Sequence, residues 1–364
     1  MSPPIAGVMV VMVLLAPVAA SAQRAPAAIE AIAEEADQAF EEKRFGDALE
    51  AFTKAVNLAP EDASLWFGKG LSAFMLGQND VAEAALTRAL KLKPRMVQAA
   101  ILLGELQYQA GRVADAVATY ESIVPYAAND RRLIARLEQW RKDSRFSARL
   151  YTSRGAHFRV LFEGPADDAI ARRAVEYLES AYSRVGSALA VHPTNTITVV
   201  LYTLQQFHDI TRAPAWAGGI YDGQIRVAVK DALSQPEELE RVLVHEFVHA
   251  LVAQVGGRSV PFWLNEGLAT AQEPGGKEWA ASMLADADGH PALDQLHGSF
   301  SKLDPSDVAV AYAHSTLAVQ RLLDMRGAAA VITLLRDLRM GVRFEAAFHQ
   351  RLALRYDDFV AMQR

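Results

Sequence analysis

The stretch His245-Glu-Phe-Val-His249, followed by Trp263-Leu-Asn-Glu-Gly267, decides how this chain is interpreted. If the first stretch is helical, its two imidazoles lie on one face, one turn apart, with Glu246 beside them. In this H-E-x-x-H arrangement two neutral His nitrogens can hold Zn²⁺, and the Glu can serve as general base. Zinc needs a third protein ligand and an open position for water, and Glu266 is the natural candidate.

The residues around the first motif favour a helix. Upstream, Ser234 and Glu237 fit a capping box, so Ser234 is the predicted N-cap. The alternative is a buried helix whose two histidines only form hydrogen bonds with their neighbours. Apolar residues flank and enter the motif at helical spacing: Leu239, Val242, Leu243, Phe247, Ala250 and Leu251.

The two stretches also carry a family resemblance. Val244–Ala250 together with Trp263–Thr270 resembles the gluzincin metallopeptidases, specifically their peptidase MA-like branch. The resemblance covers roughly residues 155–364. It implies that His245, His249 and Glu266 bind one Zn²⁺ ion and that Glu246 activates water.

Two weaker site predictions lie beside the third ligand. Thr270 follows Glu266 by one helical turn, where a hydroxyl could hydrogen-bond a ligand His and fix its tautomer. Asn265 could orient the cleft in a similar way. An exposed cap or a surface Asn explains these two residues almost as well.

The resemblance also implies a substrate-binding strand. In the gluzincins an edge strand upstream of the zinc helix binds the substrate backbone by strand addition. Gly219, Ile220 and Tyr221 are the residues expected to do so here. An ordinary hairpin is the alternative interpretation of this segment.

An oxyanion donor is expected from the C-terminal part of the chain. Ala311-Tyr-Ala-His-Ser315 resembles the A-Y-x-x-S element of peptidase MA-like proteins. Tyr312 is therefore assigned as the donor to the developing oxyanion, with His314 as a second candidate. Tyr312 could equally be a core residue, because it lies in an Ala-rich apolar stretch.

Residues 29–128 repeat with a period of 34 residues. Small residues at fixed positions let two helices approach closely and large ones fill the space between, which is the tetratricopeptide signature. Leu133 to Arg149 is predicted to be a capping helix. Three repeats and a cap form a short stable solenoid, either a partner surface or a spacer. Two series show the period: Ala36, Gly70 and Gly104 are small, and Phe52, Leu86 and Tyr120 are large.

Composition limits the remaining classes. Of the 364 residues, 51% are hydrophobic and 22% charged, which indicates a packed globular protein. The net charge of −6 gives no basic surface for a nucleic acid. The chain has no cysteine, so an exported domain would depend on its core or on a metal rather than on disulfides.

The N-terminus resembles a targeting segment. Residues 5–19 form an apolar run before Ala20-Ser-Ala22, like an h-region with its cleavage site. We therefore predict a signal peptide over residues 1–22 and a periplasmic or secreted protein. Met1-Ser-Pro-Pro4 carries no Lys or Arg, so an uncleaved membrane anchor is the alternative. The run is shorter than the roughly 20 residues that a spanning helix needs.

The pattern changes after the repeats. β-rich runs at Phe158–Phe162 and Thr196–Tyr202 enclose a helix predicted over residues 166–191, and residues 220–229 are expected to form one strand or two. Mostly helical segments follow. The chain is thus predicted to be multidomain: an all-α tetratricopeptide solenoid at 29–149, then an α+β zincin-like (gluzincin) catalytic domain at 150–364.

The predicted function is that of a zinc metallopeptidase, a hydrolase of peptide bonds. Its substrate would be a peptide or protein, and the repeats would offer a docking surface for substrate or for a protein partner. One alternative is a non-catalytic zinc-binding tetratricopeptide adaptor, although a purely structural zinc does not need Glu246. The other is a zinc hydrolase of a non-peptide amide.

Overall fold

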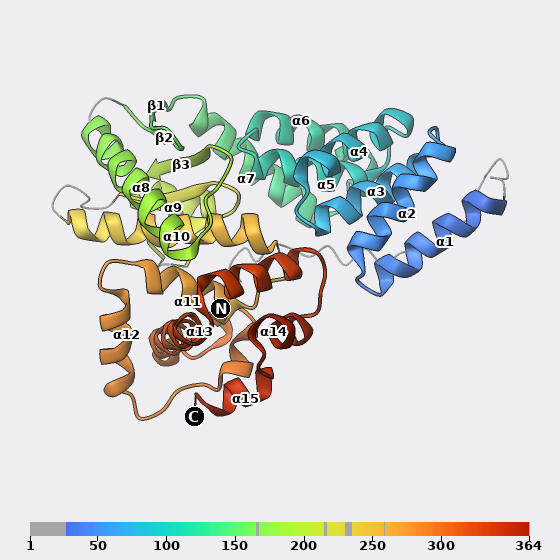
Figure 1. Cartoon of the computed structure of the whole chain (residues 1–364). Helices are drawn as coiled ribbons and strands as arrows, with labels where there is room; N and C mark the ends of the chain where they lie inside the picture. Colours follow the sequence, from blue (N-terminus) through green and yellow to red (C-terminus); the bar gives the residue numbers. More distant parts are fainter. Residues whose placement is uncertain (1–26, 165–166, 215–216, 230–234, 258, 364) are drawn as a thin grey trace. The chain divides into compact units, whose positions relative to one another are not determined.

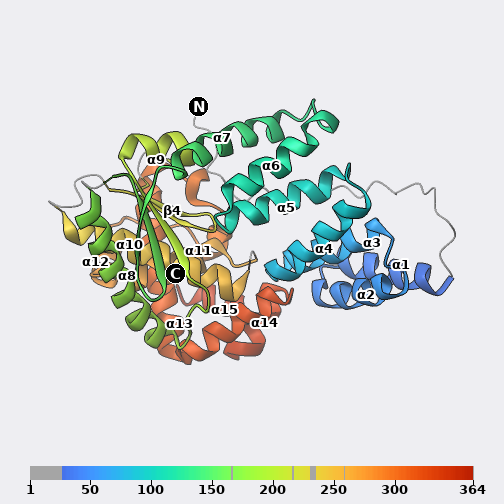
Figure 2. The ribbon, with the colours of Figure 1, turned by 90° about the horizontal axis from the view of Figure 1, so that it is seen from above.

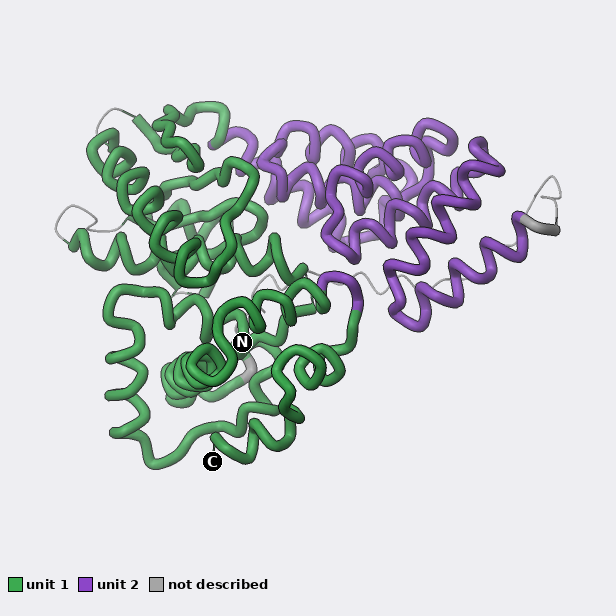
Figure 3. Tube along the Cα trace, in the orientation of Figure 1, with its two compact units in different colours: residues 1–8, 147–338, 342–364 green, residues 9–146, 339–341 purple. Residues whose placement is uncertain are grey.

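The computed structural model describes residues 27–164, 167–214, 217–229, 235–257 and 259–363. The chain forms two compact units (Figure 3). The first unit runs up to Phe146 and includes Arg339–Gly341, and the second contains Ser147–Leu338 and the segment from Val342 onward. The predicted signal peptide lies outside the described residues. None of the helices described is both long and apolar enough to cross a bilayer.

The first unit consists of successive helix pairs (Figure 2). Small and large residues of the 34-residue period interlock, as predicted. A Cβ on Gly70 would come within 2.7 Å of Leu86, and one on Gly104 within 2.5 Å of Tyr120. The pairs are α1 (Ala27–Glu41) with α2 (Phe45–Leu58), α3 (Ala63–Met75) with α4 (Asn79–Leu92), and α5 (Val97–Gln109) with α6 (Val113–Ile123). A 3₁₀ turn (Val124–Tyr126) and the capping helix α7 (Arg131–Ser147) follow.

The second unit begins with a five-stranded sheet of order β1-β2-β3-β5-β4. The central strands β2, β3 and β5 are parallel, while β1 and β4 pair antiparallel at the two edges. Residues 220–229 therefore contain two strands, separated by a turn in which Gly223 has φ 109°. The strands are β1 (Tyr151–Arg154), β2 (Phe158–Phe162), β3 (Ile197–Tyr202), β4 (Gly219–Tyr221) and β5 (Ile225–Ala228).

Two long helices pack on this sheet (Figure 1): α8 (Asp168–Leu189), which connects β2 to β3, and α10 (Pro236–Gly256). Their apolar faces share one core with the strands, including Phe158, Val199 and Phe247. The predicted N-cap Ser234 lies outside the described residues, and the N-cap of α10 is Gln235 instead. Pro236 can open the helix because the first helical N–H needs no partner. The short α9 (Leu204–Thr211) follows β3.

The rest of the second unit is helical, in agreement with the predicted α+β order. The longest helix is interrupted at Gly327, whose φ of 75° and ψ of 162° are not helical. The elements are α11 (Phe262–Gln272), α12 (Gly276–Ala285), two 3₁₀ segments (Leu293–His297 and Phe300–Lys302), α13 (Pro305–Arg339), α14 (Phe344–Leu352) and α15 (Tyr356–Ala361).

Candidate metal centre

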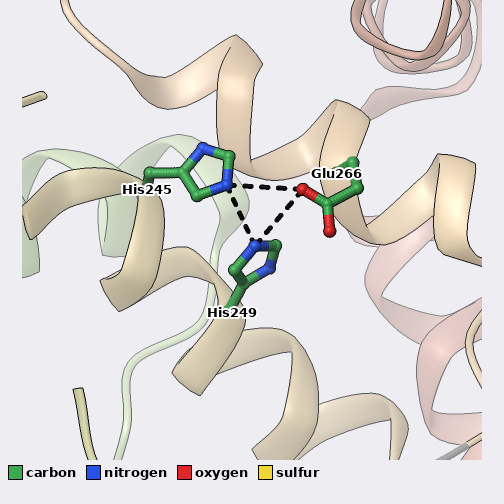
Figure 4. A group of neighbouring side chains, drawn as sticks. All are labelled: His245, His249 and Glu266. Atoms are coloured by element: carbon green, nitrogen blue, oxygen red, sulfur yellow. Dashed lines mark hydrogen bonds and ion pairs between the residues drawn. The ribbon is translucent and has the colours of Figure 1, made fainter. Parts of the chain in front are cut away.

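The packed helices α10 and α11 carry the three predicted ligands. His245 and His249 lie one turn apart on α10, and Glu266 faces them from α11 (Figure 4). The Nε2 atoms of the two histidines are 3.0 Å apart. Oε2 of Glu266 lies 3.3 Å from the first Nε2 and 3.4 Å from the second. One atom from each residue therefore converges on a common point.

These separations can be compared with a tetrahedral zinc site. Bonds of about 2.0–2.1 Å from zinc to nitrogen or oxygen place neighbouring ligand atoms about 3.3 Å apart. The observed 3.0 to 3.4 Å agree with that spacing. The donor set of two imidazoles and one carboxylate also suits zinc.

Hydrogen bonds at the far ring nitrogens orient both imidazoles. Nδ1 of His245 lies 2.6 Å from Oε1 of Glu273, and Nδ1 of His249 lies 3.1 Å from Oδ1 of Asn265. Because these oxygens accept, each Nδ1 donates and each Nε2 presents a lone pair. Thr270 does not take this place: its Oγ1 is buried without a hydrogen-bond partner in the described part of the chain.

Three acceptor atoms that face one another in a buried site require positive charge between them. Protons would supply it in the metal-free protein: burial lowers the pKa of His245, but the carboxylates of Glu266 and Glu273 outweigh it and raise the pKa to about 10. Burial likewise raises the pKa of Glu266, yet His249 and His245 lower it to about 2. A divalent cation would provide the same compensation, so these residues fit a metal ion.

Glu246 lies in the same site, next to β4. It is 5% exposed, and burial raises the pKa of its carboxyl group. Gly219, predicted as substrate-binding, packs directly against its side chain. Ile220 and Tyr221 complete β4, opposite Arg226 and Ile225 of β5.

Tyr312 reaches the metal centre from α13. Its ring centroid is 6.4 Å from that of His245. Burial, followed by the charges of Glu266 and Glu246, raises the pKa of its hydroxyl well above 10. Tyr312 therefore keeps its proton and can donate it in a hydrogen bond.

His314, the second oxyanion candidate, has other partners. Its Nδ1 lies 3.0 Å from the carbonyl oxygen of Pro291, and its ring centroid is 3.9 Å from that of His290. Burial and the nearby His290 lower its pKa to about 4, so it is neutral at physiological pH. The structure thus brings Tyr312, and not His314, into contact with the ligand set.

Comparison with known proteins agrees with this geometry. The family model of the Peptidase MA superfamily matches residues 179–357, which include α10, α11 and α13. The match lies within the second unit, which is called the Peptidase MA domain below. The tetratricopeptide repeat model matches residues 33–80 and 76–131, from the first helix pair to the start of α7. Both resemblances predicted from the sequence are confirmed.

A curated relative adds a partial match. The chain is 33% identical over 88 residues to the Small glutamine-rich tetratricopeptide repeat-containing protein 2 of Mycosarcoma maydis. The match covers 24% of this chain and 25% of that protein. This chain therefore matches about a quarter of the length of that relative.

Two residues around the candidate ligands of the Peptidase MA domain were not predicted from the sequence. Glu273, the C-cap of α11, accepts from His245, and Nη1 of Arg241 donates to its other oxygen at 2.9 Å. Helical spacing could have indicated Arg241, since it lies one turn before His245. Burial raises the pKa of Glu273, but Arg241 helps to lower it below its ordinary value.

Proposed function

We propose that the Peptidase MA domain is a zinc-dependent metallopeptidase that hydrolyses peptide bonds with water. The observation that carries the proposal is the convergence of His245, His249 and Glu266 beside a further buried carboxylate, that of Glu246. Three protein ligands leave a position open, which is typical of catalytic rather than structural zinc. When bound, zinc supplies a Lewis acid and lowers the pKa of water.

Glu246 is the proposed general base. Its burial raises the pKa of the carboxyl group, which makes the carboxylate a better proton acceptor near neutral pH. It would take a proton from the attacking water and return it to the leaving amine. A structural zinc site would gain nothing from this carboxylate, and for that reason we favour an enzyme over a zinc-binding adaptor.

Tyr312 is the proposed donor to the oxyanion that develops at the scissile carbonyl. Its hydroxyl stays protonated, because burial and nearby carboxylates raise its pKa. Its ring lies beside the candidate ligand His245, with the two ring centroids 6.4 Å apart. A neutral, preorganised donor stabilises negative charge that appears only in the transition state.

The edge strand β4 is the proposed docking site for the substrate backbone. Gly218 accepts from Ala228 at 2.9 Å and Asp222 donates to Gln224 at 3.2 Å, which makes Ile220 and Arg226 the hydrogen-bonded pair between them. The main-chain groups of Gly219 and Tyr221 therefore point away from β5. An extended peptide can pair with them along the sheet edge, beside Glu246.

Cleavage of a diverse peptide mixture by residues 23–364, followed by mass spectrometry, tests the proposal. We expect cleavage that a chelator blocks and that zinc restores. Glu246→Gln should lower turnover by about 10³-fold while zinc stays bound, because it removes only the proton acceptor. His249→Ala should lose both zinc and turnover. Zinc binding without cleavage in the wild type would favour the adaptor, and cleavage of non-peptide amides alone would favour the other hydrolase.

Two further proposals concern the rest of the chain. We propose that the repeats dock a protein partner or substrate, since stacked tetratricopeptide pairs form extended binding surfaces. We also propose export to the periplasm or the medium, on the basis of the apolar run and cleavage-site pattern in residues 1–22. Cell fractionation with N-terminal sequencing tests the second, and a mature chain that begins near Gln23 is expected.

A further inference from the structure

Glu246 is held differently from the ligands beside it. Hydrogen bonds orient His245 through Glu273 and His249 through Asn265. Within the described residues, no hydrogen-bond partner reaches the buried Oε2 of Glu246. The position of this carboxylate therefore depends on what packs against it.

Gly219 of β4 makes that packing contact. A Cβ at this position would lie 2.7 Å from Cγ of Glu246, 2.9 Å from its Oε1 and 2.9 Å from Cγ1 of Val242. Val242 and Glu246 are one turn apart on α10, so the strand backbone lies directly on this face of the helix. Only glycine allows so close an approach, so the main chain of β4 packs directly against the side chain that carries the carboxylate.

Gly219 faces Glu246 in only one register of strand β4. β4 has three residues, all of them half-buried, and it pairs with β5 at the edge of the sheet. A slip by one residue exchanges the two faces of a strand. Such a slip would turn the Ile220 side chain toward Glu246. Because the strand is short and its three residues are buried to a similar extent, the apolar pattern alone specifies the register weakly.

Arg226 provides a stronger constraint on the register. It lies opposite Ile220 in β5 and is 1% exposed. Its Nε is 3.1 Å from both carboxylate oxygens of Asp222, across the Gly223 turn, and its guanidinium also donates to the Tyr202 hydroxyl. A buried charge is costly without its partners. The pair therefore favours the one register in which Asp222 reaches Arg226.

We propose that the β4–β5 hairpin positions the Glu246 carboxylate through Gly219, and that the Arg226–Asp222 ion pair holds the hairpin in register. This inference rests on the proposed peptidase function, because it gives the hairpin a role in proton transfer. Gly219, Asp222 and Arg226 are positioning residues, since they act through Glu246. Their loss should lower kcat more than it changes KM, because the zinc ligands stay in place.

The first test compares Gly219→Ala with Gly298→Ala, whose added Cβ would meet nothing within 4 Å. We expect Gly219→Ala to lower kcat by about 10²-fold, the effect of a displaced catalytic group, with zinc affinity near that of wild type. KM should change less than kcat, because alanine keeps the main-chain groups that are proposed to pair with the substrate. Gly298→Ala should match wild type. The proposal is overturned if both variants have the same kcat, or if the loss lies entirely in KM.

The second test weakens the Arg226–Asp222 ion pair without removing the buried guanidinium. Asp222→Asn keeps an oxygen that can accept from the Gln224 amide, 3.4 Å away in the wild type, but removes the charge. We expect faster amide hydrogen exchange over residues 219–228, a lower kcat, and little further change when Arg226→Met is added. Unchanged exchange and kcat would overturn the role of the ion pair.

A third readout separates this inference from the proposed function. The ¹³C carboxyl resonance of Glu246 in the zinc-loaded protein reports the surroundings of the carboxylate without any turnover. It should shift in Gly219→Ala and in Asp222→Asn, and stay in place in Gly298→Ala. If the wild type cleaves no peptide but the resonance shifts, the peptidase proposal fails and the positioning by the hairpin stands. A resonance unchanged in all three variants overturns the positioning.

Discussion

The helix pairs of the repeats and the helix pair α10–α11 bury different kinds of atoms. In the repeat unit, Ser72 donates to the carbonyl oxygen of Gly68 at 2.9 Å, and the Tyr108 hydroxyl donates to Asp143 at 2.8 Å. On α10 and α11, polar atoms of Glu246, Glu266 and Thr270 are buried without hydrogen-bond partners among the described residues. In the repeat unit, Trp140 Nε1 is also buried without one.

This difference indicates what each region is built for. A buried polar atom without a partner destabilises the folded state by about 1–3 kcal/mol, so a cluster of them is expected only where a ligand or a reaction compensates. The repeat unit depends mainly on the fit of small residues against large ones. Substitutions in the metal centre should therefore change chemistry more than stability, and substitutions in the repeats should do the reverse.

Among the substitutions compared below, Tyr312→Phe should have the largest effect on the chemistry. It removes only the hydroxyl and leaves the ring beside His245 in place. We expect kcat to fall by about 10²–10³-fold, as for the loss of one oxyanion donor, with little change in the unfolding temperature. Steady-state kinetics and thermal unfolding measure the two effects. Full activity in this variant would remove Tyr312 from the mechanism.

His314 is a buried titratable group in the Peptidase MA domain that the mechanism does not use. Burial and the nearby His290 lower its pKa from 6.5 to about 4. Between these pH values the unfolded chain binds more protons than the folded one, so the free energy of unfolding falls as the pH drops from 6.5 to 4. The loss approaches about 3 kcal/mol once the pH is below both pKa values.

Urea unfolding of the wild type and of His314→Gln, at pH 7 and at pH 4.5, measures this effect. The advantage of the wild type over the variant should shrink at the lower pH. The comparison between the two proteins isolates His314 from the loss of zinc, which affects both. An equal pH dependence in the two proteins would contradict the assignment.

Glu273 links the metal centre to the surrounding fold. Glu273→Ala removes the acceptor at Nδ1 of His245 and the partner of Arg241. We expect zinc affinity to fall by about 10–100-fold, as for other groups that orient a ligand His. Glu273→Gln keeps an acceptor oxygen and should lie between the two. Competition with a chromophoric chelator measures the affinity, and three equal affinities would show that Glu273 does not orient His245.

Gly104→Ala tests the repeats by shape alone. Its Cβ would lie 2.5 Å from the Tyr120 ring, so overpacking should outweigh the gain in helix propensity and destabilise the unit by about 1–2 kcal/mol. Cleavage of short peptides should be unchanged. Gly298→Ala is again the reference. Loss of activity at full stability would contradict the separation between the two regions.

The parts of the fold that the sequence predicted well are those with a regular period. The repeats, strand β2 and helix α8 each follow an apolar pattern of 34, 2 or 3.6 residues, and β3 is a nearly continuous apolar run. β1 was missed because Tyr151 is its one large apolar residue and the strand is largely exposed. α9 was missed because it is short; a capping box between Thr203 and Gln206 marks its start.

The candidate site was predictable where chemistry and spacing coincide. H-E-x-x-H and the downstream Glu266 gave the three atoms that the structure brings together. Glu273 was not predicted, because its contact with His245 depends on where α11 ends and on the approach of Arg241 from α10. The packing of Gly219 on Glu246 is a tertiary contact between a strand and a helix, and no local pattern records it.

The metal centre is also local along the chain, which bears on the order in which it is assembled. The three ligands and the two acceptors that orient them all lie between residues 245 and 273. Contacts between residues close in sequence form faster than distant ones, because less chain entropy is lost in closing them. Tyr312 arrives on a later helix. During synthesis, the growing chain would thus acquire the means to bind metal before it acquires the donor needed to use it, and hydrolysis would wait for α13.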